Sequence, residues 1–231
     1  MYSASTESRE HLSTLKTLAF IFILFLSCVS PSLADTTIAQ WTYETSQPSQ
    51  ALGGTYLLPI IPEVGVGNAT ATHASAVTSY SSPAGNGSAH SFSADHWAIN
   101  DYFQFQVSTV GFTDIKLSFD QIRSANGPTS WEVAYSTTGI GYTLGSTYSV
   151  TAGWSTFNVD LSAVTALDNF ATVYFRIIAD TGPGGITPAS ESSANDNFTV
   201  TGIAVVPEPQ SLFLFGGLGL LGWTVLRRRP R

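Results

Sequence analysis

The chain has 231 residues, of which 11% are charged and 12% aromatic, and its formal net charge is −7. Between Asp35 and Val206 there are three basic residues against thirteen acidic ones, which gives this part a formal charge of −10. Such a surface repels phosphate, so we exclude nucleic-acid binding. Few charges combined with many Gly, Ser and Thr residues favour an all-β domain over a helical one.

Residues 1–34 have the pattern of a secretory signal peptide, which predicts an N-terminal signal helix. A weakly basic leader precedes an apolar stretch at residues 18–29, and small residues follow up to Ala34. This pattern predicts cleavage by signal peptidase between Ala34 and Asp35.

Two alternatives to a cleaved signal peptide remain open. A retained anchor helix is disfavoured because the apolar stretch is short and Pro31 interrupts it. Lipoprotein processing at Cys28 is the second alternative, since residues 25–28 form a loose lipobox. Cys28 is the single cysteine of the chain, so disulfides do not stabilise the mature domain.

Residues 35–205 are expected to form one β-sandwich domain. A first strand is predicted at residues 38–45, and residues 46–96 are predicted to hold loops and short edge strands because Gly and Pro interrupt them repeatedly. Further along, apolar and polar residues alternate with a period of two, which predicts antiparallel strands with one buried face each. These strands are expected at residues 103–107, 115–119, 131–135, 157–161 and 173–177, with a last strand beginning at Phe198. Two antiparallel sheets packed as a jelly roll are the predicted fold.

Catalytic motifs are scarce in residues 35–205. There is no Gly-x-Ser-x-Gly sequence, and the three histidines of this part, expected at the surface or at strand edges, lack metal-ligand spacing. The glycines around Asn86 do not follow a buried strand or open a helix, so they predict a turn and not a phosphate-binding loop. Paired carboxylates for glycoside hydrolysis stay an alternative, because spacing along the chain does not give their separation. The candidates are Asp95, Asp101, Asp120, Glu132 and Asp196.

The segment 206–231 combines a Pro-Glu-Pro turn, an apolar stretch at residues 212–226 and a terminal arginine cluster. Arginines that close an apolar stretch indicate a transmembrane helix whose charged end stays in the cytoplasm. As a helix, residues 211–226 rise about 24 Å, against about 30 Å for the hydrocarbon core, so the helix is short for a permanent anchor. The residues that define the pattern are Pro207, Glu208, Pro209, Arg227, Arg228 and Arg229.

This order of parts resembles the PEP-CTERM sorting signal of bacterial envelope proteins. The resemblance implies that the exosortase, a membrane protease-transpeptidase, recognises the segment and processes it near the Pro-Glu-Pro turn. It concerns only the C-terminal end of the chain. A plain C-terminal anchor that no enzyme reads is the alternative.

Four stretches of the central part are similar to the jelly-roll domains that often precede such signals, which in turn resemble carbohydrate-binding and galactose-binding-like sandwiches. They are residues 83–90, 97–105, 139–142 and 196–200. In such sandwiches a structural calcium often joins an early strand to the final one, so Asp196, expected to open the last strand, and Glu44 are candidate ligands. The alternative for Asp196 is a simple Asx turn. Trp97 and Tyr142, in or beside predicted loops, are candidate sugar-stacking residues.

Export at one end and an arginine-closed segment at the other place residues 35–205 outside the cytoplasmic membrane. The leading hypothesis is a non-enzymatic envelope protein, sorted by exosortase, that acts in the cell surface, exopolysaccharide or biofilm matrix. It is held transiently in the inner membrane by its C-terminal helix. A glycan-binding, adhesin-like module is the second hypothesis, and a secreted glycan hydrolase is the third.

Overall fold

The computed structural model describes residues 34–180 and 192–205. Within these residues the chain forms twelve strands and one short 3-10 helix, η1 (Thr165–Leu167). The predicted C-terminal helix and, apart from Ala34, the predicted signal peptide lie outside the described residues. In the described ranges no helix is long and apolar enough to cross a membrane.

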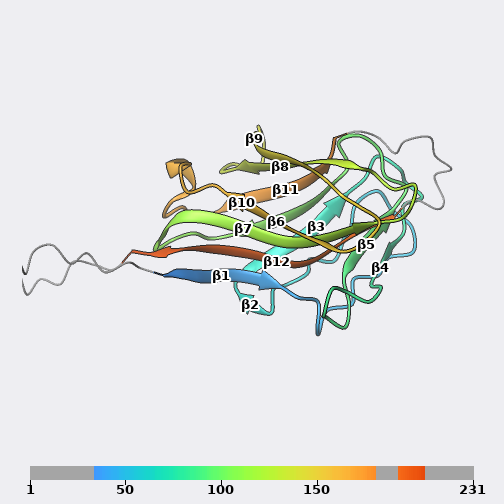
Figure 1. The fold of residues 1–231 in the computed structure, drawn as a ribbon, viewed down its shortest axis with the longest axis horizontal. Coiled ribbons are helices and arrows are strands. Elements are labelled where there is room, and N and C mark those ends of the chain that lie inside the picture. The colour runs from blue at the N-terminus through green and yellow to red at the C-terminus, as the bar shows by residue number, and fades with distance from the viewer. Residues whose placement is uncertain (1–33, 181–191, 206–231) are drawn as a thin grey trace, which may run out of the picture. The chain divides into compact units, whose positions relative to one another are not determined.

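Seven strands form the larger sheet, which we call sheet A (Figure 1). Five of them follow the order β10-β7-β12-β1-β2, while β5 pairs with β12 and β4 pairs with β5. The strands are β1 (Asp35–Trp41), β2 (Val64–Gly65), β4 (Tyr80–Ser81), β5 (Phe92–Asp95), β7 (Phe112–Arg123), β10 (Ser155–Asp160) and β12 (Ser192–Ala204).

Five strands form sheet B in the order β3-β6-β11-β8-β9. They are β3 (Gly67–Thr72), β6 (Tyr102–Val107), β8 (Ser130–Ser136), β9 (Thr143–Ser149) and β11 (Val173–Ala179). All pairs in both sheets are antiparallel, and from β6 onward nearly every connection crosses from one sheet to the other. The predicted all-β jelly-roll sandwich is therefore confirmed.

Aromatic side chains join the two sheets across the core. Phe105 of β6 stacks on Phe198 of β12 with ring centroids 3.6 Å apart, and both rings are fully buried. Trp41 of β1 meets the two phenylalanines edge-on, at 5.2 and 6.0 Å. Because aromatic rings bury large areas and fix one another's orientation, these contacts hold the sheets in register.

β12 is the last strand of the domain and lies inside sheet A, paired on both sides. On one side it follows β7, and on the other it pairs first with β5 and then with β1. A register shift against β7 between Asp196 and Thr199 marks this change of partner, and Asn197 takes a left-handed φ of 51°. The strand thus carries a bulge where β5 ends and β1 arrives.

All the predicted strands are present, but their extents differ. β1 ends at Trp41, two residues before Tyr43 adopts a φ of 53°. β9 was not predicted, because its Thr, Ser and Gly residues show no apolar alternation. β12 begins at Ser192 and not at Phe198, so Asp196 lies within the strand and does not open it.

Candidate functional site

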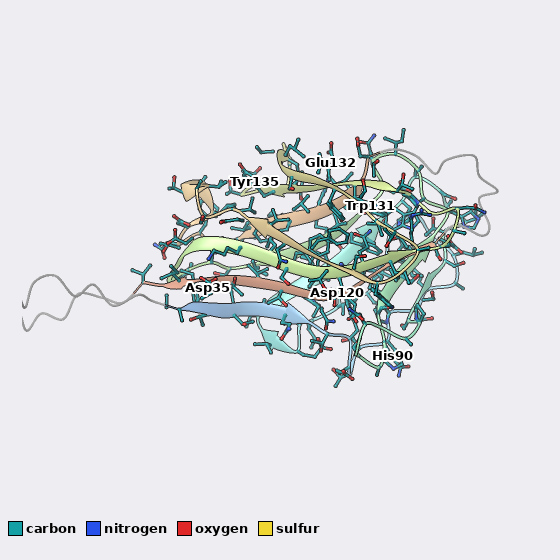
Figure 2. All side chains as sticks on the ribbon, in the orientation of Figure 1. Asp35, His90, Asp120, Trp131, Glu132 and Tyr135 are labelled. Atoms are coloured by element: carbon teal, nitrogen blue, oxygen red, sulfur yellow. The ribbon has the colours of Figure 1, made fainter. Side chains whose placement is uncertain are left out.

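Two buried carboxylates, Asp120 of β7 and Asp196 of β12, meet at the bulge, and Figure 2 shows Asp120 within the body of the sandwich. Asp196 accepts hydrogen bonds from the Asn86 amide N–H (2.7 Å), the Ser88 hydroxyl (2.5 Å) and the Asn197 amide N–H (2.8 Å). Asp120 accepts from the side-chain amides of Asn86 (3.1 Å) and Asn197 (2.8 Å). The pair is therefore a hydrogen-bonded junction between the last strand and a turn far earlier in the chain.

The turn at residues 85–88 fits closely against this junction. Gly85 donates its N–H to the Ser88 carbonyl, and the chain bends at residues 86–89. A Cβ at Gly85 would collide with the Ser88 hydroxyl and the Asp196 carboxylate. Glycine is therefore required by close approach, since no other residue leaves the carboxylate its donors.

The two predicted calcium ligands lie on either side of the same turn. Glu44 accepts from the Ala89 N–H (3.2 Å), whereas Asp196 accepts from Ser88 next to it. Calcium takes about six to eight oxygen ligands, but the oxygens of Asp196 already face N–H and O–H hydrogens. Among the described residues no group of three His, Cys, Asp or Glu side chains is placed to hold a metal, and calcium at Asp196 and Glu44 stays a prediction.

The other predicted carboxylates are distributed over separate places. Asp95 accepts from the Ser79 N–H and faces His96, and Asp101 accepts from the Ala74 and Ala98 N–H groups. Only Asp120 and Asp196 come together, and the amide of Asn197 donates to both.

Two aromatic groups expected near the surface are buried. Trp97 is 3% exposed and packs against His73, Phe103 and Trp131, so its ring offers no face to a ligand. His73 is also in the core, with its Nδ1 3.3 Å from Asp101. His90 and His96 do lie nearer the surface, bonded to Gln47 and Asp95.

Tyr142 lies on the outer face of sheet B, where strand register brings polar and aromatic side chains into rows. One row holds Thr70, Gln104, Arg176, Ala134 and Leu144 from five neighbouring strands. The next row holds Asn68, Gln106, Tyr174 and Ser136. We call this surface the outer platform.

Arg176 is fixed at the centre of the outer platform. Its guanidinium lies between the rings of Tyr102 and Tyr142, 3.7 and 3.8 Å from their centroids. Its Nε donates to Gln104 Oε1 (2.9 Å), which also accepts from the Tyr142 hydroxyl (2.8 Å). Burial raises the pKa of Tyr142, with Arg176 opposing, so the hydroxyl stays a donor.

The platform ends in a hollow of about 290 Å³ lined by Asn68 and Gln106. Planar guanidinium, amide and hydroxyl groups can bond to the hydroxyls of a sugar, and the stacked tyrosines hold the guanidinium in place. Of this arrangement the sequence indicated only Tyr142. Gln104, Gln106 and Arg176 occupy alternate positions of predicted strands, so the sequence indicated that their side chains point away from the core. It did not indicate that these side chains lie next to one another across the strands.

The C-terminal end of the chain matches the family model of the PEP-CTERM protein-sorting motif over residues 205–229. The match begins directly after Ala204, the last residue of β12. The chain therefore carries a PEP-CTERM sorting signal, which marks it as an exported protein. No curated protein matches the chain.

Among solved structures, the chain is similar to a xylan-binding domain, CBM22-1, of Xyn10C from Paenibacillus barcinonensis (11% identity, 76% of this chain, 100% of that chain, TM-score 0.44). A CBM4 structure matches at 14% identity over 71% of this chain and 84% of that one, with a TM-score of 0.37. The K3 cleaved adhesin domain of Lys-gingipain from Porphyromonas gingivalis matches at 14% identity over 71% and 98%, with a TM-score of 0.42.

Gly85→Ala is expected to destabilise the domain by roughly 1–3 kcal/mol, because the new methyl group displaces the turn from Asp196. Urea denaturation measures the change in the free energy of unfolding. Gly153→Ala is the control, since its Cβ meets nothing within 4 Å. Equal urea midpoints for the two variants would contradict this account of the junction.

Burial raises the pKa of Asp196 above its ordinary value, and its three donors oppose the shift. The folded state therefore holds this proton at a pH where the unfolded chain has released it. The contribution of Asp196 to the free energy of unfolding should rise as the pH falls from neutral toward about 4, the unfolded pKa. Urea midpoints of wild type and Asp196→Asn across this range measure it, and carboxyl ¹³C shifts of the wild type give a second reading. If the difference in urea midpoint between wild type and Asp196→Asn does not change with pH, the raised pKa of Asp196 is contradicted.

Proposed function

We propose that this protein is a non-catalytic component of the bacterial cell envelope that exosortase processes near Pro207–Pro209. The observation that carries the proposal is the sorting motif at residues 205–229, which starts where β12 ends. Signal peptidase removes residues 1–34, the C-terminal segment holds the precursor in the inner membrane, and processing delivers the sandwich to the cell surface or its polysaccharide matrix.

The use of the carboxylates and histidines in the described residues supports a non-catalytic role. Asp120 and Asp196 are nearly or fully buried, and each accepts hydrogen bonds from the turn at residues 85–88. A catalytic pair of a glycosidase instead flanks an open space of about 5–10 Å for the sugar and water. The buried His73 packs between Trp97 and Tyr80.

Glu208→Ala is expected to leave the C-terminal segment on the protein, because it removes the charge of the Pro-Glu-Pro turn. The intact mass and the subcellular fraction of the protein, in hosts with and without exosortase, measure the effect. Asp160→Ala, which removes an exposed acid from the sandwich, is the control and should be processed normally. A wild-type protein that keeps its full C-terminal segment in the exosortase host would refute processing.

The outer platform supports a second, compatible function, the binding of a glycan. Arg176 is fixed by two rings and one amide, yet no carboxylate of the described residues lies within salt-bridge distance of it. The donors on its outer nitrogens and the nearby amides of Gln104 and Gln106 suit an array of sugar hydroxyls. Because the inner faces of the tyrosines are occupied by Arg176, recognition relies on hydrogen bonds more than on ring stacking.

Arg176→Ala is expected to weaken glycan binding about tenfold or more, since a hydrogen bond from a charged donor contributes about 1.5–3 kcal/mol. Affinity electrophoresis in gels containing neutral or acidic polysaccharides measures the change. Lys116→Ala, which removes an equal charge from the exposed pair with Asp35, is the control. If no polysaccharide retards the wild type, or if the control loses as much, the platform is not the binding site.

A further inference from the structure

β9 is an outer edge of sheet B, and its only strand partner among the described residues is β8 (Figure 1). No backbone hydrogen bond links residues 143–149 to any described residue outside β8. The amide and carbonyl groups on the far side of β9 are therefore available to another strand.

Most other edge strands of the sandwich are too short or too well covered to pair with another strand. β2 and β4 are only two residues long, and β3 is bridged to Thr55 and Ile60 of the preceding segment. β9 has seven residues and lacks proline and charge, the usual devices against pairing. One register shift against β8 leaves Gly145 as an extra residue, while Ser146–Ser149 pair regularly.

Charge also distinguishes this edge. The mature domain has a formal charge of −10, so two copies repel each other over much of their surface. From Val133 to Val159 there is no Asp, Glu, Lys or Arg, and Leu144 and Ile140 are 55% and 78% exposed. Contact along β9 would cover apolar surface without bringing like charges together.

We propose that β9 is the surface through which two copies of this protein associate, strand against strand and antiparallel. A strand edge is complementary to itself around a two-fold axis, so a second copy satisfies it with the same backbone groups. Sheet B then continues from one copy into the other. The inference is independent of the proposed function, because it rests on the edge and not on the platform or the sorting segment.

Cysteine cross-linking tests the geometry. The single native cysteine, Cys28, lies in the predicted signal peptide. After cleavage, an introduced cysteine is therefore the one thiol that can form a disulfide. Single variants Ser146→Cys, Thr147→Cys and Ser149→Cys are made in the full chain, and the processed protein is recovered from an exosortase-containing host. At least one should form a disulfide-linked dimer under mild oxidation. Asn158→Cys, exposed on β10 at the edge of sheet A, is the control and should stay monomeric. Failure of all three to cross-link overturns the proposal.

Light scattering of the same processed protein tests the association itself. The wild type is expected to approach twice the monomer mass as its concentration rises, and the double variant Leu144→Lys/Thr147→Lys to stay monomeric with an unchanged melting temperature. Asn158→Lys adds the same kind of charge to β10 and should still dimerise. A wild type that is monomeric at every concentration, or a β10 variant that loses dimerisation equally, overturns the proposal. If the double variant does not fold, the cysteine series decides alone.

Discussion

The buried carboxylate of Asp196 is the interaction on which the rest of the sandwich depends. A carboxylate withdrawn from water costs several kcal/mol unless donors surround it. Here three donors do so, two of them on a turn more than a hundred residues earlier in the chain. Closing the bulge of β12 and docking the turn at residues 85–88 are therefore one event. β5 and β1 both use the strand that this event shapes, so sheet A depends on it as well.

The last strand, β12, therefore contributes to both the core and sheet A. β12 supplies Phe198 to the ring stack between the sheets and lies between β7 and its two other partners. Pairing between strands far apart in the chain loses loop-closure entropy before the stabilising contacts form. The domain is therefore expected to fold slowly. An exported chain completes sheet A only after its final strand has crossed the membrane, immediately ahead of the sorting segment.

The parts of the structure predicted from the sequence are those governed by side-chain alternation. β6, β8 and β11 follow from inward-facing Phe, Trp, Val and Ile residues at every second position. The sequence did not predict the start of β12, because Asn195 and Asp196 are polar and yet buried. Their burial depends on the bulge and on hydrogen-bond donors from distant parts of the chain. Trp97 was misplaced for a related reason: polar residues on both sides of it, such as His96 and Asn100, suggest a loop, yet its ring reaches the core. The Tyr102–Arg176–Tyr142 stack joins residues of separate segments, so no local pattern contains it.

The pairing of Asp35 with Ile203 places both ends of the described domain at the same end of the sandwich, and Figure 2 shows Asp35 far from His90. Any pull transmitted through the C-terminal segment enters the sandwich along the axis of β12. Hydrogen bonds to β1 and β7 flank this strand, so they bear such a load side by side and must fail together. A strand at the margin of the sheet would instead peel away one bond at a time. The central position of β12 therefore lets the hydrogen bonds on both of its sides resist such a pull together.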